Sequence, residues 1–448
     1  MSFPGGVADK MGNIYEAKWA VRQLLDVLRS EAEAIRFESI TRPDQGFEFQ
    51  VERGGTVEHH QTKRRNSEGN WTLRRLETEG VFKAFQAKLS ESETDRCVFV
   101  SQHPAPELSG LIDKAAIAQS AEELESASGI GAGGDLNVIC QIWSVDRETA
   151  YGWLRRLRVT VQPEEEIDGL INAYAKICFS KSSAAFPILR TFLEERMNRR
   201  LSTEEIRREL CSEGKLPVRD WALDATLAGR IKKITDAYLD SYAPFGFSRE
   251  VIRRTEAQKI LHTLQGDLSK KLLILTGKAG AGKSGVIRQI IGDLRESEIP
   301  CMAFRIDRLL EGGGPDTAED LGRILCERKE SPIITLAGKY PSEPSVLLID
   351  QVDAVSDVSG RGQRLKDIVL ALIADALRFP FIRIVLGCRQ FDFVNDQRLK
   401  LLDSRHDVEK IAVELLDWER EVVPVLLKLK VDPASIRNSE RELLRLPL

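Results

Sequence analysis

The chain has 448 residues, of which 42% are hydrophobic and 30% charged, and its formal net charge is −4. This length calls for more than one hydrophobic core, and the composition is ordinary for a globular protein. The small negative charge excludes a global basic field, so contact with nucleic acid would need a local patch. No run of about 18 apolar residues and no signal peptide is visible, so we expect a cytoplasmic protein without membrane contact. The seven cysteines are scattered and include no C-x-x-C pair, which argues against disulfides and a zinc site.

The chain begins with a predicted helix followed by three predicted strands. Apolar residues recur at helical spacing over residues 10–33. Strand-like runs follow at residues 34–40, 47–51 and 57–63. Residues 52–55 contain two glycines and predict a tight hairpin turn between the second and third runs.

Acidic and polar side chains on these strands form the skeleton of a metal-dependent nuclease. Glu48 lies on the second strand, and Gln61 and Lys63 share one face of the third, because alternate residues of a strand point the same way. Oxygen ligands bind Mg²⁺, and a lysine beside them stabilises the charge that develops at phosphorus or orients the attacking water. Asp44 is an alternative to Glu48. The competing interpretation is an ordinary polar hairpin with a solvated face.

With Glu16 on the preceding helix, this pattern resembles the PD-(D/E)xK nuclease superfamily, and more narrowly its restriction-like members fused to bacterial defence proteins. The resemblance implies that Glu48, Gln61 and Lys63 are catalytic, and that Glu16, Glu48 and Gln61 bind the metal. Two positions depart from the family pattern, since Glu48 replaces the commoner Asp and Gln61 replaces Glu. A glutamine offers a carbonyl oxygen without charge, so one carboxylate is missing unless Glu16 completes the set.

Basic residues cluster after the third strand and surround a tryptophan. They would neutralise DNA phosphates, and the indole would offer a stacking surface. A solvated charge run is the alternative. His59 and His60 are adjacent on a strand and face opposite ways, so we expect no joint metal site. The basic cluster comprises Lys63, Arg64, Arg65, Arg74 and Arg75, with Trp71 among them.

The remainder of the first 244 residues alternates predicted helices with short predicted strands. Ser202 and Glu205 predict a capping box at the start of a helix that runs to Cys211. We expect a nuclease-like domain over residues 1–200 and a helical connector over 201–244. The other expected elements are strands at 97–101, 137–143 and 159–161, helices at 108–124, 147–157 and 219–239, and a linker at 242–246.

Residues 277–284 match G-x-x-x-x-G-K-S, the loop that wraps nucleotide phosphates. An apolar strand precedes the motif and a helical pattern follows it, which is the context that this motif requires. The glycines let the backbone turn its N–H groups toward a phosphate, the lysine would reach the β- and γ-phosphates, and the serine would bind Mg²⁺. The motif therefore predicts ATP and Mg²⁺ as cofactors. The predicted nucleotide-binding residues are Gly277, Gly280, Gly282, Lys283 and Ser284.

Residues 345–350 form an apolar run that ends in Asp350, as in a Walker B strand, and Asp350 is the second predicted Mg²⁺ ligand. Further strands are expected at 301–306, 381–387 and 410–415, alternating with helices. This alternation predicts a parallel sheet with helices on both faces. A strand between the P-loop and Walker B in sequence indicates the additional-strand class of P-loop ATPases.

Gln351 occupies the position in which motor-type ATPases carry a glutamate that activates water, and Asp353 lies three residues after Asp350. Together with Arg389 at the tip of a strand, this pattern resembles the STAND class of NACHT and NB-ARC-like signalling ATPases. In that class nucleotide exchange acts mainly as a switch and hydrolysis is slow. The resemblance implies that Asp353 positions the attacking water and that Arg389 senses the γ-phosphate. The alternatives are a helix N-cap and a surface salt bridge.

The NTPase domain is expected over residues 245–417, followed at 418–448 by the start of a helical lid. By the same resemblance Pro447 belongs to a leucine-proline segment near the adenine. The chain stops there, either because it is cut at a domain edge or because it is a natural short form. The predicted fold class is α/β, with a restriction-endonuclease-like mixed domain and a parallel-sheet NTPase domain.

This combination resembles the bacterial antiphage ATPases of the Avs type. The resemblance implies a phage protein as trigger, read by a sensor not present in this chain, and an ATP-bound homo-oligomer. The assembled protein would be a Mg²⁺-dependent endonuclease that cleaves double-stranded DNA. One alternative is a non-catalytic signalling scaffold with an inactive nuclease domain. The other is an ATP-driven restriction motor, against which Gln351 argues.

Overall fold

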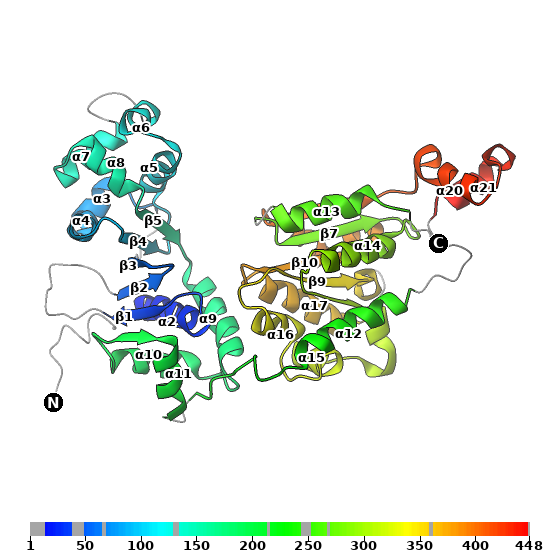
Figure 1. Cartoon of the computed structure of the whole chain (residues 1–448), viewed down its shortest axis with the longest axis horizontal. Coiled ribbons are helices and arrows are strands. Elements are labelled where there is room, and N and C mark those ends of the chain that lie inside the picture. Colours follow the sequence, from blue (N-terminus) through cyan, green and yellow to red (C-terminus); the bar gives the residue numbers. More distant parts are fainter. Residues whose placement is uncertain are drawn as a thin grey trace. The chain divides into compact units, whose positions relative to one another are not determined.

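The computed structural model describes residues 14–37, 49–64, 69–128, 134–212, 216–242, 252–266, 269–357 and 362–446. The chain forms two compact units, Met1–Arg219 and Asp220–Leu448, each with its own sheet (Figure 1). The expected connector over 201–244 is therefore divided between the units. Within the described residues, no helix has the length and apolar character needed to cross a membrane.

The first unit contains a six-stranded mixed sheet in the order β5-β4-β3-β2-β1-β6. The first three strands form an antiparallel meander, whereas β4 and β5 continue parallel to β3. Gly54 and Gly55 both adopt left-handed φ angles, of 57° and 73°, which permits the tight turn of the predicted hairpin. The strands are β1 (Ala34–Phe37), β2 (Phe49–Arg53), β3 (Thr56–Lys63), β4 (Arg96–Ser101), β5 (Leu157–Val161) and β6 (Arg200–Ser202).

Helix α2 (Ile14–Leu28) covers one face of this sheet. Trp19 Nε1 donates to His60 Nδ1 at 3.2 Å, and His60 stacks on Phe49 with ring centroids 4.9 Å apart. His59 points to the other face and contacts Asp95, so the two histidines face opposite ways as predicted. Helix α2 is shorter than the expected range of 10–33, of which residues 10–13 lie outside the described part.

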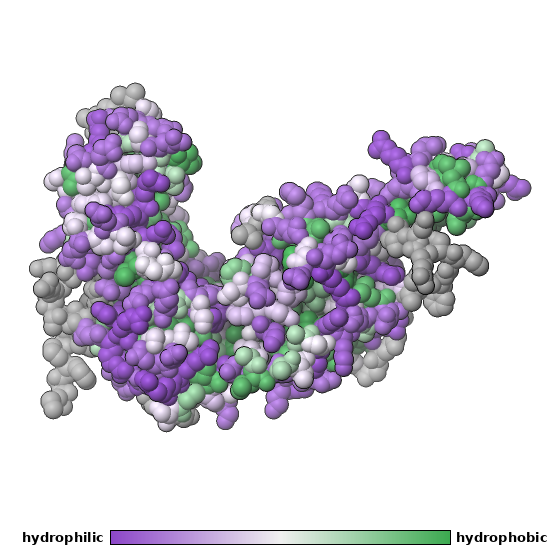
Figure 2. Space-filling view, in the orientation of Figure 1, coloured by the Kyte–Doolittle hydropathy of each residue, from purple (hydrophilic) through white to green (hydrophobic). Residues whose placement is uncertain are grey.

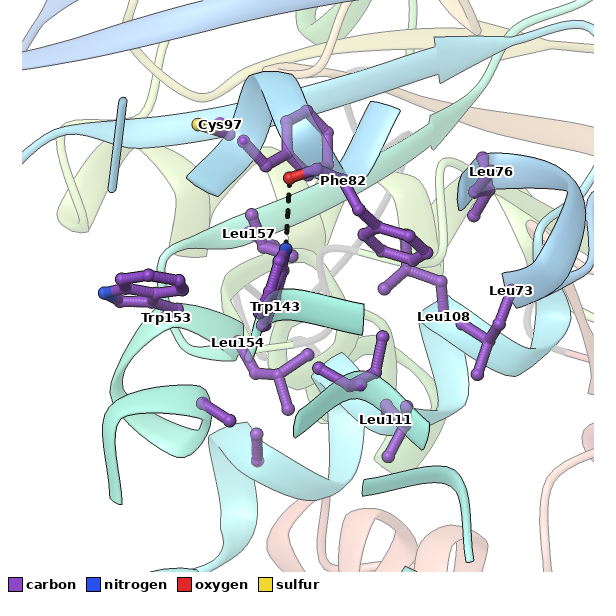
Figure 3. Close-up of a cluster of buried hydrophobic side chains, with 14 of the residues drawn as sticks. Leu73, Leu76, Phe82, Cys97, Leu108, Leu111, Trp143, Trp153, Leu154 and Leu157 are labelled. Carbon is purple, nitrogen blue, oxygen red and sulfur yellow. Dashed lines mark hydrogen bonds between the residues drawn. The ribbon is translucent and has the colours of Figure 1, made fainter. Parts of the chain in front are cut away.

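A helical layer in the first unit encloses a second apolar core, which Figure 3 shows. Trp143 is 1% exposed and donates from Nε1 to the carbonyl of Phe82 at 3.1 Å. The strand expected at 137–143 is wrong, because these residues belong to helix α7 (Asp135–Trp143). Leu136, Ile139 and Trp143 are buried at helical spacing, which a strand of alternating exposure would not produce.

The other expected elements of the first unit are present with shifted ends. The expected helix at 108–124 is two helices, and the capping box is confirmed, since the Ser202 N–H donates to the Glu205 carboxylate at 2.9 Å. The remaining helices are α3 (Leu73–Thr78), α4 (Val81–Glu91), α5 (Pro106–Ile117), α6 (Ala121–Ser128), α8 (Arg147–Leu154), α9 (Glu164–Cys178), α10 (Ala185–Glu194) and α11 (Thr203–Ser212).

The second unit contains a five-stranded sheet in the order β11-β7-β10-β9-β8. All its strands are parallel, as the alternation of strands and helices predicted. Strand β10 lies between the P-loop strand β7 and the Walker B strand β9, which confirms the additional-strand arrangement. The strands are β7 (Leu272–Gly277), β8 (Cys301–Arg305), β9 (Ser345–Asp350), β10 (Ile382–Arg389) and β11 (Val408–Val413).

Helices lie on both faces of the parallel sheet (Figure 1). Helix α12 (Leu227–Asp240) packs beside the edge strand β8, where the Thr235 hydroxyl donates to the Cys301 carbonyl at 3.0 Å. The helix is shorter than the expected range of 219–239 at its start. The other α-helices are α13 (Thr255–Gly266), α14 (Lys283–Glu296), α15 (Ala318–Cys326), α16 (Pro332–Lys339), α17 (Gln363–Ala376), α18 (Gln390–Asn395), α19 (Gln397–Leu402), α20 (Val423–Lys428) and α21 (Asn438–Leu444).

Apolar side chains are exposed near the C-terminal end of the described residues, and the cysteines are unpaired. The C-terminal helices α20 and α21 carry exposed apolar side chains, visible as a green area in Figure 2. All seven cysteines lie in the described residues and are free thiols, as predicted. Cys211 on α11 is exposed, Cys140 is half-buried, and the other five are buried.

Candidate nucleotide site

The P-loop joins the end of β7 to the start of α14, and glycine is required at several of its positions. A Cβ on Gly277 would lie 2.6 Å from the carbonyl oxygen of Val413 on the neighbouring strand. Gly280 and Gly282 have φ angles of 77° and 93°, a region that L side chains rarely adopt. The loop therefore presents its N–H groups and the N-terminus of α14 to the same space, which is an arrangement that binds anions.

Lys283 is the first residue of α14 and is 9% exposed. Its Nζ donates to the carbonyls of Gly277 at 3.2 Å and Lys278 at 3.1 Å. Burial lowers the pKa of Lys283, although Asp353 and Asp350 favour its charged form. The ammonium group is thus held over the loop, where a phosphate would replace carbonyl partners.

Asp350 ends β9 and is 1% exposed. Its Oδ1 accepts the N–H of Gln351 at 2.8 Å, and its Oδ2 accepts the hydroxyls of Tyr238 at 2.9 Å and Tyr242 at 3.0 Å. The Ser284 side chain lies near the Tyr242 hydroxyl. The two predicted Mg²⁺ ligands, Ser284 and Asp350, are therefore brought to one place, and their oxygen chemistry fits that ion.

The structure brings together the two residues that resemble STAND site residues. Arg389 Nε lies 3.0 Å from Asp353 Oδ2, and the Arg389 N–H donates to Asp353 Oδ1 at 3.2 Å. Burial raises the pKa of Asp353, while Arg389 and Lys283 oppose that rise. Their roles toward water and the γ-phosphate stay predictions, but both lie at the carboxyl end of the sheet, beside the P-loop.

The C-terminal segment also reaches the P-loop. Leu446 lies against Gly280, since its Cδ2 would be 3.2 Å from a Cβ built there. The backbones of Leu416 and Arg445 are joined by an N–H to carbonyl bond of 3.0 Å, which ties this segment to the end of the sheet. Pro447, the predicted adenine neighbour, lies outside the described residues.

In the first unit the predicted nuclease residues are placed only in part. Gln61 and Lys63 share the face of β3 opposite to the one that α2 covers, and Glu48 lies outside the described residues. Gln61 is 2% exposed, and its Oε1 has no hydrogen-bond partner within the described part of the chain. An oxygen of this kind fits a metal ligand. The described residues nevertheless contain no group of three His, Cys, Asp or Glu side chains that would hold a metal.

Glu16 lies in the first turn of α2, on the helix that covers the other face of this sheet. That turn reaches the edge where β3, β4 and β5 end, because the Tyr15 hydroxyl donates to the carbonyl of Gln162 at 2.9 Å. The Gln162 N–H in turn donates to the carbonyl of Ser101, which pairs with Lys63 in the sheet. Glu16 and Lys63 thus lie on opposite faces of the sheet, near the edge where β3, β4 and β5 end.

The predicted stacking surface on Trp71 is wrong. Trp71 is 2% exposed and donates from Nε1 to the Ser101 hydroxyl at 2.6 Å, so its ring belongs to the core. Arg75 lies over this ring, and Arg64 forms an ion pair with Glu164 at 3.3 Å. Arg65 lies outside the described residues. Arg64 and Arg75 therefore have partners within the unit, and Trp71 offers no exposed aromatic surface.

The two tyrosines that donate hydrogen bonds to Asp350 were not predicted from the sequence. Tyr242 fell in the expected linker, and Tyr238 in a helix expected only to pack. Both lie more than 100 residues from Asp350 in the chain. Tyr238 lies on α12 and Tyr242 just after its end, and nothing in the sequence identifies the carboxylate as their partner.

The glycine-rich loop, the buried lysine, the acidic strand and the strand order define the second unit as a P-loop NTPase domain. No protein-family model matches the chain, and no curated protein matches it. One similar solved structure is a Walker-type ATPase of Pyrococcus abyssi, with a TM-score of 0.32, 16% identity, and coverage of 44% of this chain and 66% of that one.

Two further solved structures have comparable similarity. AMPPCP-bound DnaA from Aquifex aeolicus has a TM-score of 0.30 and 15% identity, and 44% of this chain and 57% of that one are covered. The Cap4 SAVED/CARF-domain containing receptor of Acinetobacter baumannii, bound to a cyclic trinucleotide, has a TM-score of 0.29 and 13% identity. There 69% of this chain and 64% of that one are covered. The chain thus spans less than two thirds of each of the three, and TM-scores this low carry no inference about function.

Proposed function

We propose that nucleotide binding at the P-loop acts as a switch on the first unit, as in signalling ATPases, rather than as the power source of a motor. The observation that carries this proposal is the side chain after Asp350. Gln351 lies beside the site, with its Nε2 3.5 Å from the Tyr242 hydroxyl. An amide has no basic oxygen comparable to a carboxylate, so it is a poor general base for water, and slow hydrolysis follows.

The first unit is proposed to be the effector, a metal-dependent DNA endonuclease. Three observations support it: the order of helix, antiparallel meander, helices and parallel strand; the unpaired Oε1 of buried Gln61; and Lys63 on the same face. The reaction is attack of water on a phosphodiester, in which a P–O bond forms and the bond to the leaving alkoxide breaks. Lys63 would stabilise the charge on phosphoryl oxygens. A bound divalent ion would supply Lewis-acid activation of water.

The wider setting belongs to the same proposal and rests on the sequence resemblance. The protein would act in antiphage defence in the cytoplasm, with ATP-bound protomers assembling into a homo-oligomer that cleaves double-stranded DNA. A phage protein would be the trigger, read by a sensor outside this chain. ATP would shift the population toward the assembled, active state, because a ligand that binds one state more tightly than the other favours that state.

Plasmid cleavage in Mg²⁺ or Mn²⁺, with and without ATP, tests the effector. Lys63→Ala is the test variant, and Lys83→Ala, an exposed lysine on α4, is the matched control. Cleavage by the wild type and the control but not by Lys63→Ala supports the proposal. Equal cleavage by all three proteins would contradict the role of Lys63. A dependence on ATP that Lys283→Ala removes would support the switch.

A non-catalytic scaffold is the second candidate function. The observation in its favour is that the described residues hold no cluster of three metal-ligating side chains, and that Gln61 is neutral. This function predicts nucleotide-dependent assembly in light scattering without DNA cleavage at any protein concentration. Cleavage that Lys63→Ala abolishes would exclude it.

A further inference from the structure

Two tyrosines lie against the metal-binding side of the nucleotide site. Tyr238 is on α12, and Tyr242 is the second residue after the end of that helix at Asp240. The hydroxyls of Tyr238 and Tyr242 both donate to one oxygen, Oδ2 of Asp350, at 2.9 and 3.0 Å. Their rings pack edge to face, with centroids 5.3 Å apart at 62°. Tyr238 is 3% exposed, so its hydroxyl is committed to this contact. We call these residues the tyrosine pair.

The position of the Tyr242 hydroxyl is the informative feature. It donates to the Asp350 carboxylate at 3.0 Å, and the Ser284 side chain lies near it. These are the two groups that the P-loop architecture assigns to the Mg²⁺ of a bound nucleotide. The hydroxyl thus takes up an oxygen of Asp350 that a cation with ligands at about 2.0–2.1 Å would need, and it lies beside the serine that would be the second ligand.

We infer that Tyr242 occupies the magnesium position of the nucleotide site, so that the docked tyrosine pair and a magnesium-bound nucleotide exclude each other. This inference rests on the proposed nucleotide switch and supplies its internal restraint. Release of Tyr242 is the structural event that a magnesium nucleotide would require. The nucleotide alone, without the metal, needs only the P-loop and would leave the pair in place.

The chemistry of the contact makes it a strong restraint. Burial raises the pKa of Tyr242 to about 12, with Asp350 as the next cause, so the phenol remains an O–H donor at neutral pH. A hydrogen bond to a buried carboxylate is stronger than one between neutral groups. Arg305 lies over the Tyr242 ring at 4.4 Å, and Gln351 approaches its hydroxyl. The ring contacts depend on the aromatic ring, whereas the contact with Asp350 depends on the oxygen alone.

Helix α12 is held firmly at its middle and less so along one side. Thr235 accepts the N–H of Ala303 at 3.3 Å and donates to Cys301, which ties this turn to β8. Beside the helix lies an open cavity of about 460 Å³, lined in part by Ile234, Ala237 and Tyr238. The side of α12 that lines this cavity is therefore less tightly packed than its opposite side, where Tyr238 belongs to a buried cluster.

The position of α12 in the chain gives the contact its consequence. The helix begins at Leu227, a few residues after the boundary of the two units at Arg219 and Asp220. The tyrosine pair is at the opposite end of this helix, so a signal from it to the boundary would require α12 to shift as a whole. The occupancy of the metal position, rather than of the phosphate loop, would be the signal.

The test compares nucleotide binding with and without the metal in the full chain. Titration with a fluorescent ADP analogue gives Kd in Mg²⁺ and in EDTA for the wild type, Tyr242→Phe and Tyr238→Phe. Tyr340→Phe, a tyrosine of the same unit at the end of α16, is the matched control. Phenylalanine keeps the ring contacts and removes one oxygen, and a melting curve checks that each variant is folded.

Tyr242→Phe is expected to tighten binding in Mg²⁺ roughly 10- to 100-fold, the value of one hydrogen bond to a charged acceptor, and to leave Kd in EDTA unchanged. Hydrogen exchange is the second readout, and the amides at the end of α12 should lose protection when Mg²⁺ and nucleotide bind together.

Unchanged or weaker binding of Tyr242→Phe in Mg²⁺, or equal tightening in both buffers, would overturn the inference. So would full protection of α12 in the magnesium complex. If the wild type binds no nucleotide in either buffer, the proposed switch and this inference both fail. Binding in both buffers without an effect of Tyr242→Phe overturns the inference alone.

Discussion

Gly387 offers a sharp test of the packing around the Walker B carboxylate. It lies on the buried strand β10, and a Cβ at this position would lie 2.5 Å from Asp350 Oδ1 and 3.0 Å from Cδ1 of Ile287. Both distances are shorter than a van der Waals contact. The substitution Gly387→Ala therefore forces either the methyl group or the carboxylate to move.

The size of the effect follows from these contacts. An extra methyl group in a packed interior costs about 1–3 kcal/mol. If Asp350 turns away instead, it loses the Gln351 N–H at 2.8 Å, and a bond to a charged acceptor is worth about 1.5–3 kcal/mol. We expect a loss of about 1–3 kcal/mol, which lowers the Tm of the second unit by roughly 2–12 °C. Binding of magnesium nucleotide should weaken at least about tenfold, equivalent to about 1.4 kcal/mol, because the carboxylate is displaced.

Differential scanning calorimetry of the full chain, with nucleotide titration, measures both effects. Gly292→Ala is the matched control, because Gly292 lies in α14 and a Cβ there meets no atom within 4 Å. This control should leave binding unchanged and stabilise the helix by up to about 1 kcal/mol. If Gly387→Ala melts and binds like the wild type, then Asp350 does not pack against β10 as described.

Buried charges give three further predictions. Burial disfavours ionised Glu58, but His60 and nearby guanidinium groups outweigh it and lower the pKa of this carboxyl from 4.5 to about 2. Its charge thus stabilises the first unit by roughly 3 kcal/mol above pH 4.5, and this contribution is lost as the pH falls toward 2. In Glu58→Gln the free energy of unfolding should depend less on pH across that range. Lys283→Ala should weaken nucleotide binding at least about tenfold with little change in Tm, because within the described residues its amine donates to two loop carbonyls that a phosphate would replace. Lys366→Met removes the cation that pairs with fully buried Asp396, which keeps only backbone N–H donors, and should destabilise the second unit by up to about 3 kcal/mol in urea unfolding. Adding Asp396→Asn should recover part of this loss.

The NTPase fold was predictable because its signals are local. The P-loop is one continuous stretch of sequence, and its motif predicts glycine-specific backbone angles, which Gly280 and Gly282 adopt. The Walker B strand ends at its acidic residue, Asp350. The parallel direction of the strands followed from the alternation of strands and helices, since parallel neighbours need a crossover connection.

The errors have a common physical origin in contacts between distant residues. Val138, Ile139 and Ile142 are β-branched, which favours a strand, yet packing around Trp143 makes the segment a helix. Trp71 was expected at the surface, but Ser101, thirty residues away, provides the partner that its indole N–H needs in the core. Such partners are invisible until the chain is folded.

The candidate sites divide along the same line. Lys283 and Ser284 were identified from one motif, whereas the Tyr242 hydroxyl that donates to Asp350 came only from the structure. In the first unit, Gln61 and Lys63 do share a strand face. The completeness of that site depends on Glu48, outside the described residues.

The distribution of the cysteines has a practical consequence. A thiol reacts as its thiolate, and burial raises the pKa of Cys97, Cys178 and Cys388 while also blocking access to them. Cys211, on α11, is the exposed thiol among the seven. A maleimide dye added to the unaltered chain should therefore attach mainly at this residue, a few positions before the boundary of the units at Arg219. The protein thus carries a natural attachment point for a spectroscopic reporter, on the side of that boundary away from the nucleotide site.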